Sequence, residues 1–355
     1  RTLKDNYNDK YEYILPDITL NKNLFLDEFG FGNFQTNVKI HNYDTNRYKK
    51  FLINDFNWSF NETAKNSFYN SNFLTSLKNV NYEVKNENKF KADTSNELFG
   101  AVGYLASIDF FKKNGKNNNQ LLSPKILLRY APNHMRKDDG DYGLNGKDIF
   151  SLNRLSSVEN FESGTNLTLG LDYEYKNDNA EKLNFSIGQI INEKKNNKNM
   201  PSSTSLDKRF SDIVGVFNYD NNDNFKFDYS YALDQNYKET NFNEINANYS
   251  MNNVDFNFNY LEENKISGGK EYLKSDLEIR KGSNGLLKFS NKRNLITNSS
   301  EFYNLSYEYI NDCLTAGIAY RREFYNDSEL ESENSLMFTI TLNTFGAVNS
   351  PSFSQ

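Results

Sequence analysis

Apolar and polar residues alternate along much of this chain with a period of two. In the segment NLTLGLDYEY, the residues Leu167, Leu169, Leu171, Tyr173 and Tyr175 are separated by polar residues or glycine. Successive side chains of a β-strand point to opposite sides, so this pattern predicts a strand with one apolar and one hydrated face, which a helix would not produce. The same alternation predicts strands in FKFDYSYAL (225–233), VDFNFNY (254–260), YNLSYEY (303–309) and SLMFTITL (335–342).

The connections between the predicted strands alternate between short and long. In an outer-membrane β-barrel, short periplasmic turns alternate in this way with long external loops. The turn at Asn311–Asp312 is then expected on the periplasmic side, and the last strand, from Asn334 to Phe345, is expected to end there. The short turns lie near 220–224, 251–253, 281–285 and 311–312, and the longer polar connections cover 234–241, 262–270, 291–300 and 325–334.

The same rule, applied upstream, predicts roughly 18 strands of about ten residues, the length that a tilted strand needs to cross the hydrocarbon layer. An open sheet in a soluble β-sandwich rarely reaches this size, and a soluble β-helix would show a fixed short repeat, which this sequence lacks. We therefore expect an all-β fold, a transmembrane antiparallel β-barrel over residues 1–346 that is part of a larger barrel. A periplasmic tail is expected at 347–355.

One connection is much longer than the others. The loop at 132–164 includes the short apolar pieces Ile149–Phe150, Leu152 and Leu155 within a polar sequence. Loops of this length usually carry function, and in a barrel they can fold back into the lumen. We expect one of these roles for this loop.

Composition narrows the class of protein further. Only 37% of the 355 residues are hydrophobic, yet 29 are Phe and 24 are Tyr, whereas a disordered chain would be poor in aromatic residues. Lys and Arg number 41 against 47 Asp and Glu, and no long basic run is present, which argues against a nucleic-acid partner. No apolar run is long enough for a transmembrane helix. The start, RTLKDNYNDK, has neither an initiator Met nor a signal peptide, so we expect an internal or processed fragment.

Three segments resemble the LptD family of LPS-assembly proteins, in the form associated with alphaproteobacteria. They are LLSPKILLRYAPNHMRK at 121–137, DIFSLNRLSSVENFESGTNLTLGLDYEY at 148–175, and the stretch from Leu305 to Gly346. The third is the most specific. It combines a Tyr-rich strand, an acidic turn, the chain's one cysteine, an Arg-rich strand end, a charged loop and a final alternating strand, in that order.

The resemblance implies a function, a location and partners. Such a barrel, in the outer membrane of a Gram-negative bacterium, receives lipopolysaccharide and inserts it into the outer leaflet through a seam between its first and last strands. An N-terminal periplasmic domain joins the periplasmic Lpt bridge, and an LptE-like lipoprotein plugs the barrel. This chain is expected to hold only the C-terminal barrel part. No cofactor, no metal and no catalytic residue is expected.

The single cysteine, Cys313, follows the predicted turn at Asn311–Asp312. Strand alternation places it on the lumen side, and from the residues alone it is a free thiol, a small buried residue or a partner in a bond to another chain. The resemblance implies a disulfide to the N-terminal periplasmic domain, in a compartment that supports disulfides. Enterobacterial relatives carry two adjacent cysteines where this chain has Asp312–Cys313. We hypothesise one disulfide to a cysteine upstream of Arg1.

Two further sets of residues are candidates under this resemblance. The dibasic pair Arg321–Arg322, near the outer end of its strand, is expected either to meet lipid phosphates or to anchor the strand at the membrane interface. The last strand is expected to form one lip of the seam. Its residues Leu336, Phe338, Ile340 and Leu342 would face lipid, and Thr339, Thr341 and Asn343 would face the lumen.

Other classes of function find less support in the sequence. The two histidines, His41 and His134, have no Ser and acid partners at a recognisable spacing, so an enzyme is disfavoured. The cluster Asp138, Asp139 and Asp141 lacks the order of a calcium loop and is interpreted as a hydrated loop tip, with divalent ions that bridge lipid phosphates as the alternative. The main alternative function is a passive porin or uptake barrel, and a third is an adhesin or structural barrel.

Overall fold

The computed structural model shows an all-β protein. It describes residues 12–26, 30–43, 47–62, 69–87, 90, 93–114, 118–132, 134–177, 181–324, 334–342, 346–349 and 353–354. In these ranges the one helix is a single 3-10 turn, Ser202–Thr204, and no helix is long and apolar enough to cross a membrane. The chain divides into two units, residues 1–110, 122–172 and 187–214, and residues 111–121, 173–186 and 215–355, which are described in turn.

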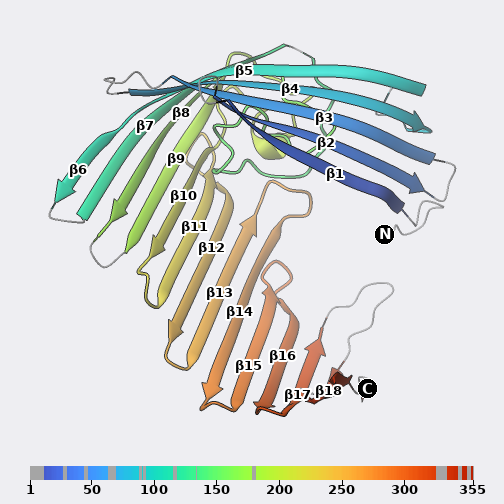
Figure 1. The fold of residues 1–355 in the computed structure, drawn as a ribbon, viewed down its shortest axis with the longest axis vertical. Helices are drawn as coiled ribbons and strands as arrows, with labels where there is room; N and C mark the ends of the chain where they lie inside the picture. Colours follow the sequence, from blue (N-terminus) through green and yellow to red (C-terminus); the bar gives the residue numbers. More distant parts are fainter. Residues whose placement is uncertain are drawn as a thin grey trace. The chain divides into compact units, whose positions relative to one another are not determined.

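The first unit is an antiparallel sheet whose neighbours in sequence are neighbours in space (Figure 1). Its strands β1 to β5 are 14 to 17 residues long. That exceeds the length of about 9–11 residues that a tilted strand needs to cross a membrane. The strands are β1 (Glu12–Leu26), β2 (Gly30–Tyr43), β3 (Arg47–Glu62), β4 (Tyr69–Lys85), β5 (Asp93–Ile108) and β7 (Asn118–Ala131), which pairs with β5.

The two faces of this sheet differ in what covers them. We call the face that carries Ile53, Val80, Phe99 and Leu127 the covered face, because these side chains are at most 4% exposed. The opposite, open face carries large apolar residues that remain exposed, with Leu98 at 65%. Alternation along each strand produces both faces. Exposed side chains of the open face include Leu52, Leu77, Leu98, Val102, Tyr104, Ile126, Leu128 and Tyr130.

The covered face is buried by the segment 132–163, which connects β7 to β8. Phe161 of this segment is 2% exposed and belongs to one apolar cluster with side chains of β3, β4, β5 and β7, and Leu152 packs against that cluster. Full burial of a side chain of this size stabilises a fold by about 1.5–3 kcal/mol. The long loop therefore folds back over the sheet instead of extending into solvent.

Five strands have residues in both units. They are β7 and, in addition, β6 (Phe110–Asn114), β8 (Gly164–Lys176), β9 (Lys182–Asn192) and β10 (Ile213–Asp220). A second long connection, 193–212, follows β9. Its backbone joins the loop 132–163 where the N–H of Asp138 donates to the carbonyl of Asn199 at 2.8 Å.

The second unit is a run of antiparallel strands with short and long connections in alternation, as the sequence predicted. In β16 the side chains of Tyr303, Leu305, Tyr307 and Tyr309 are exposed on one face, while Asn304, Ser306 and Glu308 lie on the other. The strands are β11 (Phe225–Leu233), β12 (Thr240–Met251), β13 (Val254–Glu263), β14 (Lys270–Lys281), β15 (Gly285–Asn294), β16 (Ser299–Ile310), β17 (Leu314–Glu323) and β18 (Asn334–Leu342).

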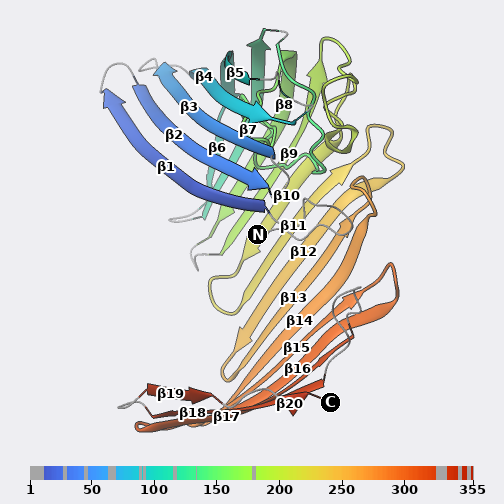
Figure 2. The same cartoon turned by 90° about the vertical axis from the view of Figure 1, so that its right-hand side faces the viewer.

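The segment expected to be a tail contains two short strands. Strand β19 (Gly346–Asn349) and strand β20 (Phe353–Ser354) both pair with β18, on the edge opposite β17 (Figure 2). Strand β18 ends at Leu342, three residues before the end that the sequence predicted, and Asn343 to Phe345 lie outside the described residues. The described residues form 20 strands, of which β6, β19 and β20 are the shortest. The other 17 are close to the predicted number of roughly 18.

The different surroundings of the two faces can be tested in β16. We expect Leu305→Arg, on the apolar face, to destabilise the protein in a lipid bilayer by about 2–4 kcal/mol, because it places a charge against hydrocarbon. Ser306→Arg, one residue further on the opposite face, should have little effect. Guanidinium unfolding of the protein in lipid vesicles measures both. Equal losses for the two variants would contradict the assignment of the faces.

Candidate functional site

The loop 132–163 is held against the covered face by a buried arginine of the sheet. Arg129 of β7 is fully buried, and its guanidinium donates to the carbonyls of Leu152 at 2.7 Å, of Gly164 at 3.1 Å and of Glu162. Arg129 takes this direction because it shares the covered-face alternation with Leu127 and Ala131. One side chain of the sheet thus fixes the backbone of the loop at two places and the start of the next strand at a third.

A second arginine joins this cluster from the loop itself. Arg154 binds the Glu162 carboxylate in a two-pronged arrangement, with Nε to Oε2 at 2.7 Å, and the Arg129 guanidinium lies 3.6 Å from the same carboxylate. Burial raises the pKa of Glu162, but the two arginines and the hydrogen bonds from Arg154 outweigh it and hold the pKa below the usual value of 4.5. Glu162 is therefore ionised, and it compensates two buried cations.

Arg136 anchors the first part of the loop. Its guanidinium forms an ion pair with Glu97 of β5 and donates to the carbonyl of Glu159. It also lies over the rings of Tyr82, Phe90 and Phe99, at 4.8 to 5.7 Å from their centroids. A cation over an aromatic face that is shielded from water stabilises this packing. The loop is thus tied to β4 and β5 as well as to β7.

His134 stacks on the ring of Phe99, with centroids 5.0 Å apart. In the acidic cluster, Asp139 and Asp141 are exposed, as a hydrated loop tip would be, whereas Asp138 is only 6% exposed. Its carboxylate accepts hydrogen bonds from the Gly140 N–H, the Tyr142 hydroxyl and the Ser157 hydroxyl, at 2.8 to 3.0 Å. Asp138 thus closes a turn within the loop. In the part of the chain that the structure describes, no group of His, Cys, Asp and Glu is arranged to hold a metal ion.

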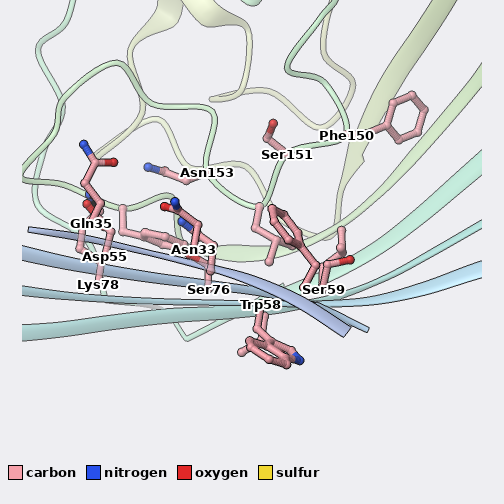
Figure 3. A pocket seen from close by; sticks show the side chains of 16 residues that line it. Asn33, Gln35, Asp55, Trp58, Ser59, Ser76, Lys78, Phe150, Ser151 and Asn153 are labelled. Carbon is pink, nitrogen blue, oxygen red and sulfur yellow. Dashed lines mark hydrogen bonds and ion pairs between the residues drawn. The ribbon is translucent and has the colours of Figure 1, made fainter. Parts of the chain in front are cut away.

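A cavity of about 400 Å³ lies between the tip of the loop and strands β2, β3 and β4 (Figure 3). Asn33, Gln35 and Asn153 lie on the loop side of the strands in this view, whereas Trp58 points to the opposite side. The volume falls in the range of about 300–1,000 Å³ that is typical of small-molecule sites. The lining includes Phe31, Asn33, Gln35, Asp55, Asn57, Ser76 and Lys78 from the sheet and Phe150, Ser151, Leu152 and Asn153 from the loop.

The charges in this cavity are paired within the protein. Lys78 of β4 is 6% exposed, and its ammonium lies 2.8 Å from the Asp55 carboxylate of β3. The same ammonium donates to the carbonyl of Val158 in the loop at 2.7 Å. Lys78 is therefore a third anchor of the loop, and it brings no uncompensated charge to the cavity.

Cys313 lies in the turn between β16 and β17, where the sequence placed it beside a strand start. It is exposed and makes no disulfide within the chain. The Asn311 carboxamide oxygen accepts from the N–H groups of Cys313 at 3.0 Å and of Leu314 at 2.7 Å, which fixes the turn. The thiol is thus presented at the surface by a short, well-defined turn.

The two arginines of β17 lie on opposite faces of the strand because they are consecutive. Arg321 forms an ion pair with Glu323 at 2.6 Å and lies over the ring of Phe302, while the guanidinium of Arg322 lies over the ring of Phe324 at 4.6 Å. The structure therefore does not bring them together on one surface.

Strand β18 alternates in exposure from Phe338 to Leu342, whereas Met337, which shares the face of the two threonines, is 42% exposed. Phe338, Ile340 and Leu342 are 43 to 51% exposed, whereas Thr339 and Thr341 are less exposed. Leu336 is half-buried, and Asn343 lies outside the described residues. Residue by residue, Phe338 pairs with Ile318 and Ile340 with Ala316 of β17. An apolar row thus continues across both strands.

Sequence reasoning missed the three residues that hold the loop, Arg129, Arg154 and Glu162. Arg129 leaves a visible signal, a charged residue at an apolar position of the alternating segment LLSPKILLRYA. A buried charge requires a buried partner, so this signal called for an acidic residue elsewhere. Nothing in the sequence identifies Glu162 among the many acidic residues as that partner.

Comparison with known proteins gives one informative match. A model of the family described as "LptD: LPS transport system D" matches residues 2–295. This range includes the loop 132–163 and the first two resembling segments but ends before Cys313, the two arginines of β17 and strand β18. Among curated proteins, none matches the sequence significantly.

Solved structures with a similar backbone include two engineered variants of the porin of Rh. blastica, each 11% identical in sequence. One covers 87% of this chain and 96% of the porin, the other 86% and 95%, and both have a TM-score of 0.33. A likeness at this level adds nothing to the fold described above.

The Glu162 cluster leads to a prediction about the loop. Glu162→Gln leaves Arg129 and Arg154 buried without an anion, and loss of one partner of a buried ion pair costs about 3–5 kcal/mol. We expect the loop to leave the sheet more often, so that tryptic cleavage after the exposed Lys147 becomes at least about a hundredfold faster. Limited proteolysis with mass spectrometry measures the rate.

A matched control is Asp139→Asn, which removes an exposed ion pair with Lys137 in the same loop. Exposed pairs contribute only about 0–1 kcal/mol, so the cleavage rate should barely change. Cleavage of Glu162→Gln at the unmodified rate would show that the buried cluster does not hold the loop.

Proposed function

Because this chain belongs to the LptD family, LPS transport system D, we propose that it forms part of an outer-membrane β-barrel that inserts lipopolysaccharide into the outer leaflet of a Gram-negative bacterium. The family accounts for transport of lipopolysaccharide. The site of insertion and the sideways opening of the barrel are the parts that we propose. The chain would supply the wall of the barrel and one lip of its seam.

The observation that carries this proposal is the contrast between the two faces of the wall. The open face of β3 to β7 is lined by exposed apolar side chains, whereas the covered face carries buried polar and charged groups beside the loop 132–163. Lipopolysaccharide has apolar tails and a large polar saccharide. Because burial of unpaired polar groups is costly, the saccharide must travel on the hydrated side while the tails stay in apolar surroundings. A wall with these two faces, opened at a seam, meets both demands.

Strand β18 is our candidate for one lip of the seam. Among the described residues, one of its edges pairs with β17 through nine residue pairs, whereas the other edge pairs with β19 through four and with β20 through two. The second edge is therefore held by fewer hydrogen bonds and is the easier one to open. The apolar row of Phe338, Ile340 and Leu342 would contact the lipid tails at that edge, and Thr339, Thr341 and Asn343 would face the lumen.

The proposed partners follow from the same function. Lipopolysaccharide would arrive from the periplasmic Lpt bridge, through an N-terminal periplasmic domain, and an LptE-like lipoprotein would plug the remaining lumen. The loop 132–163 already occupies the covered face of β3 to β5, so that plug would lie beside it. At the other end of β17 from the periplasmic turn, Arg321 and Arg322 would meet lipid phosphates, one from each face of the strand.

Photo-crosslinking tests whether lipopolysaccharide passes along β18. We expect p-benzoylphenylalanine at Phe338 to form adducts with lipopolysaccharide in living cells, because the tails would pass this edge during insertion. Phe256 of β13 is the control, because it is also an exposed phenylalanine of an apolar face but lies in the middle of the wall. Immunoblots for lipopolysaccharide adducts measure both. Equal adduct formation at the two positions, or none at Phe338, would rule out β18 as the lip.

We also propose that Cys313 forms a disulfide with a cysteine upstream of this chain, which would tie the domain that delivers the lipid to the mouth of the barrel. Its support is the exposed thiol in a turn fixed by Asn311. The full-length protein should migrate differently on non-reducing electrophoresis from its Cys313→Ser variant, and identically after reduction. The same mobility before reduction would disprove the bond.

A further inference from the structure

The cavity between the loop tip and strands β2 to β4 is lined by carboxamide groups whose hydrogen bonds are only partly used. Asn33 donates to Asn23 at 2.8 Å, and Gln35 donates to Asn37 at 3.2 Å. The carboxamide oxygen of Asn57 accepts from Ser76 at 2.7 Å, and that of Asn153 accepts from the Glu162 N–H at 3.0 Å. Each side chain is therefore held in place by one of its two polar atoms.

The second polar atom of each carboxamide remains for a ligand. These atoms are two acceptors, the Asn33 and Gln35 oxygens, and two donors, the Asn57 and Asn153 nitrogens, and no described residue bonds them. A hydroxyl group both donates and accepts, so a polyhydroxyl ligand satisfies such a mixed set. A ligand that only accepts, such as phosphate, satisfies only the two donors.

The charges in the cavity are a second and stronger argument against an anionic ligand. Its one cation, Lys78, is neutralised by Asp55 at 2.8 Å and donates to the Val158 carbonyl at 2.7 Å. A phosphate would therefore meet a carboxylate and a lysine that is already used. Phe31, which is 47% exposed, adds an apolar ring to the rim. Planar carboxamides beside an exposed aromatic ring suit the hydroxyls and the apolar faces of a sugar.

We propose that this cavity is a binding site for a neutral saccharide. The assignment of that saccharide to the head group of lipopolysaccharide rests on the function proposed above, whereas the preference for neutral sugar over phosphate rests on the cavity alone. The site is formed only when the loop is docked, because Asn153 and Ser151 come from the loop. The buried Arg129, Arg154 and Glu162 cluster therefore positions one wall of the site.

The test measures binding to the purified full chain in detergent by isothermal titration calorimetry. The probes are the lipid-free oligosaccharide released from the host's lipopolysaccharide and stripped of phosphate, maltohexaose as a generic neutral oligosaccharide, and inorganic phosphate. We expect the first probe to bind and phosphate not to bind. The double variant Asn33→Leu/Gln35→Leu should bind the sugar at least about tenfold more weakly, because it removes two acceptors.

Two further variants test whether the loss of binding is specific to the cavity and independent of misfolding. Asn304→Leu, a matched substitution in β16 of the other unit, should leave binding unchanged. Ser151→Trp fills the cavity from the loop and leaves the wall intact, so it should also abolish binding even if the double variant folds poorly. Resistance of the loop to trypsin shows whether each variant is folded. Binding that survives both cavity variants, binding of phosphate, or no binding of either sugar would overturn the proposal.

The outcomes separate this inference from the proposed function. If maltohexaose binds as tightly as the oligosaccharide from lipopolysaccharide, the neutral-saccharide site stands and its ligand is a free sugar. If neither sugar binds while Phe338 still crosslinks to lipopolysaccharide, the cavity assignment fails and the transport function stands. If sugars bind but no position on β18 crosslinks, the cavity assignment stands and the seam fails.

Discussion

The ionised carboxylate of Glu162, buried between Arg129 and Arg154, is the interaction on which the site depends. Without it, two guanidinium groups would lie in a dry interior, which costs several kcal/mol. With it, Arg129 is free to bind three carbonyls of the loop and of the start of β8. The loop is then fixed against the sheet, and both the apolar cluster around Phe161 and the cavity beside Asn153 follow from that docking.

The docked loop changes what one face of the wall presents. A β-strand of alternating residues gives an apolar and a polar face, and the polar face of a wide barrel would normally border water. Here the loop 132–163 covers much of that face in the first unit, with apolar residues such as Ile53 and Val80 beneath it. Beside the docked loop, a cavity of about 400 Å³ carries the ion pair of Lys78 with Asp55 and several carboxamide groups.

The second unit differs from the first in strand length and in how its side chains are buried. Its strands are shorter, few of its side chains are fully buried, and alternation alone separates Leu305 from Ser306. Where the structure describes both partners, strand β18 is held on one edge by nine residue pairs and on the other by six, in two short strands. Since each backbone hydrogen bond contributes only about 0.5–1.5 kcal/mol net, an edge held by few of them can open without loss of the rest of the sheet. The proposed transport through a seam would use both a fixed region around the loop and an edge that opens easily.

The sequence alone determined the strands, their alternating faces and the connections between them, because the period of two and the turn residues are local properties. It also placed Cys313 directly after the turn at Asn311–Asp312 and predicted one face for the apolar residues of β18. The tertiary structure alone decided which side chains meet. Arg129, Arg154 and Glu162 lie up to 33 residues apart, and the cavity joins residues of three strands, the last of them Lys78, to a loop segment that begins 72 residues later at Phe150. Such contacts depend on how the loop docks, and docking is set by the burial of charges and apolar side chains together, which no local pattern records.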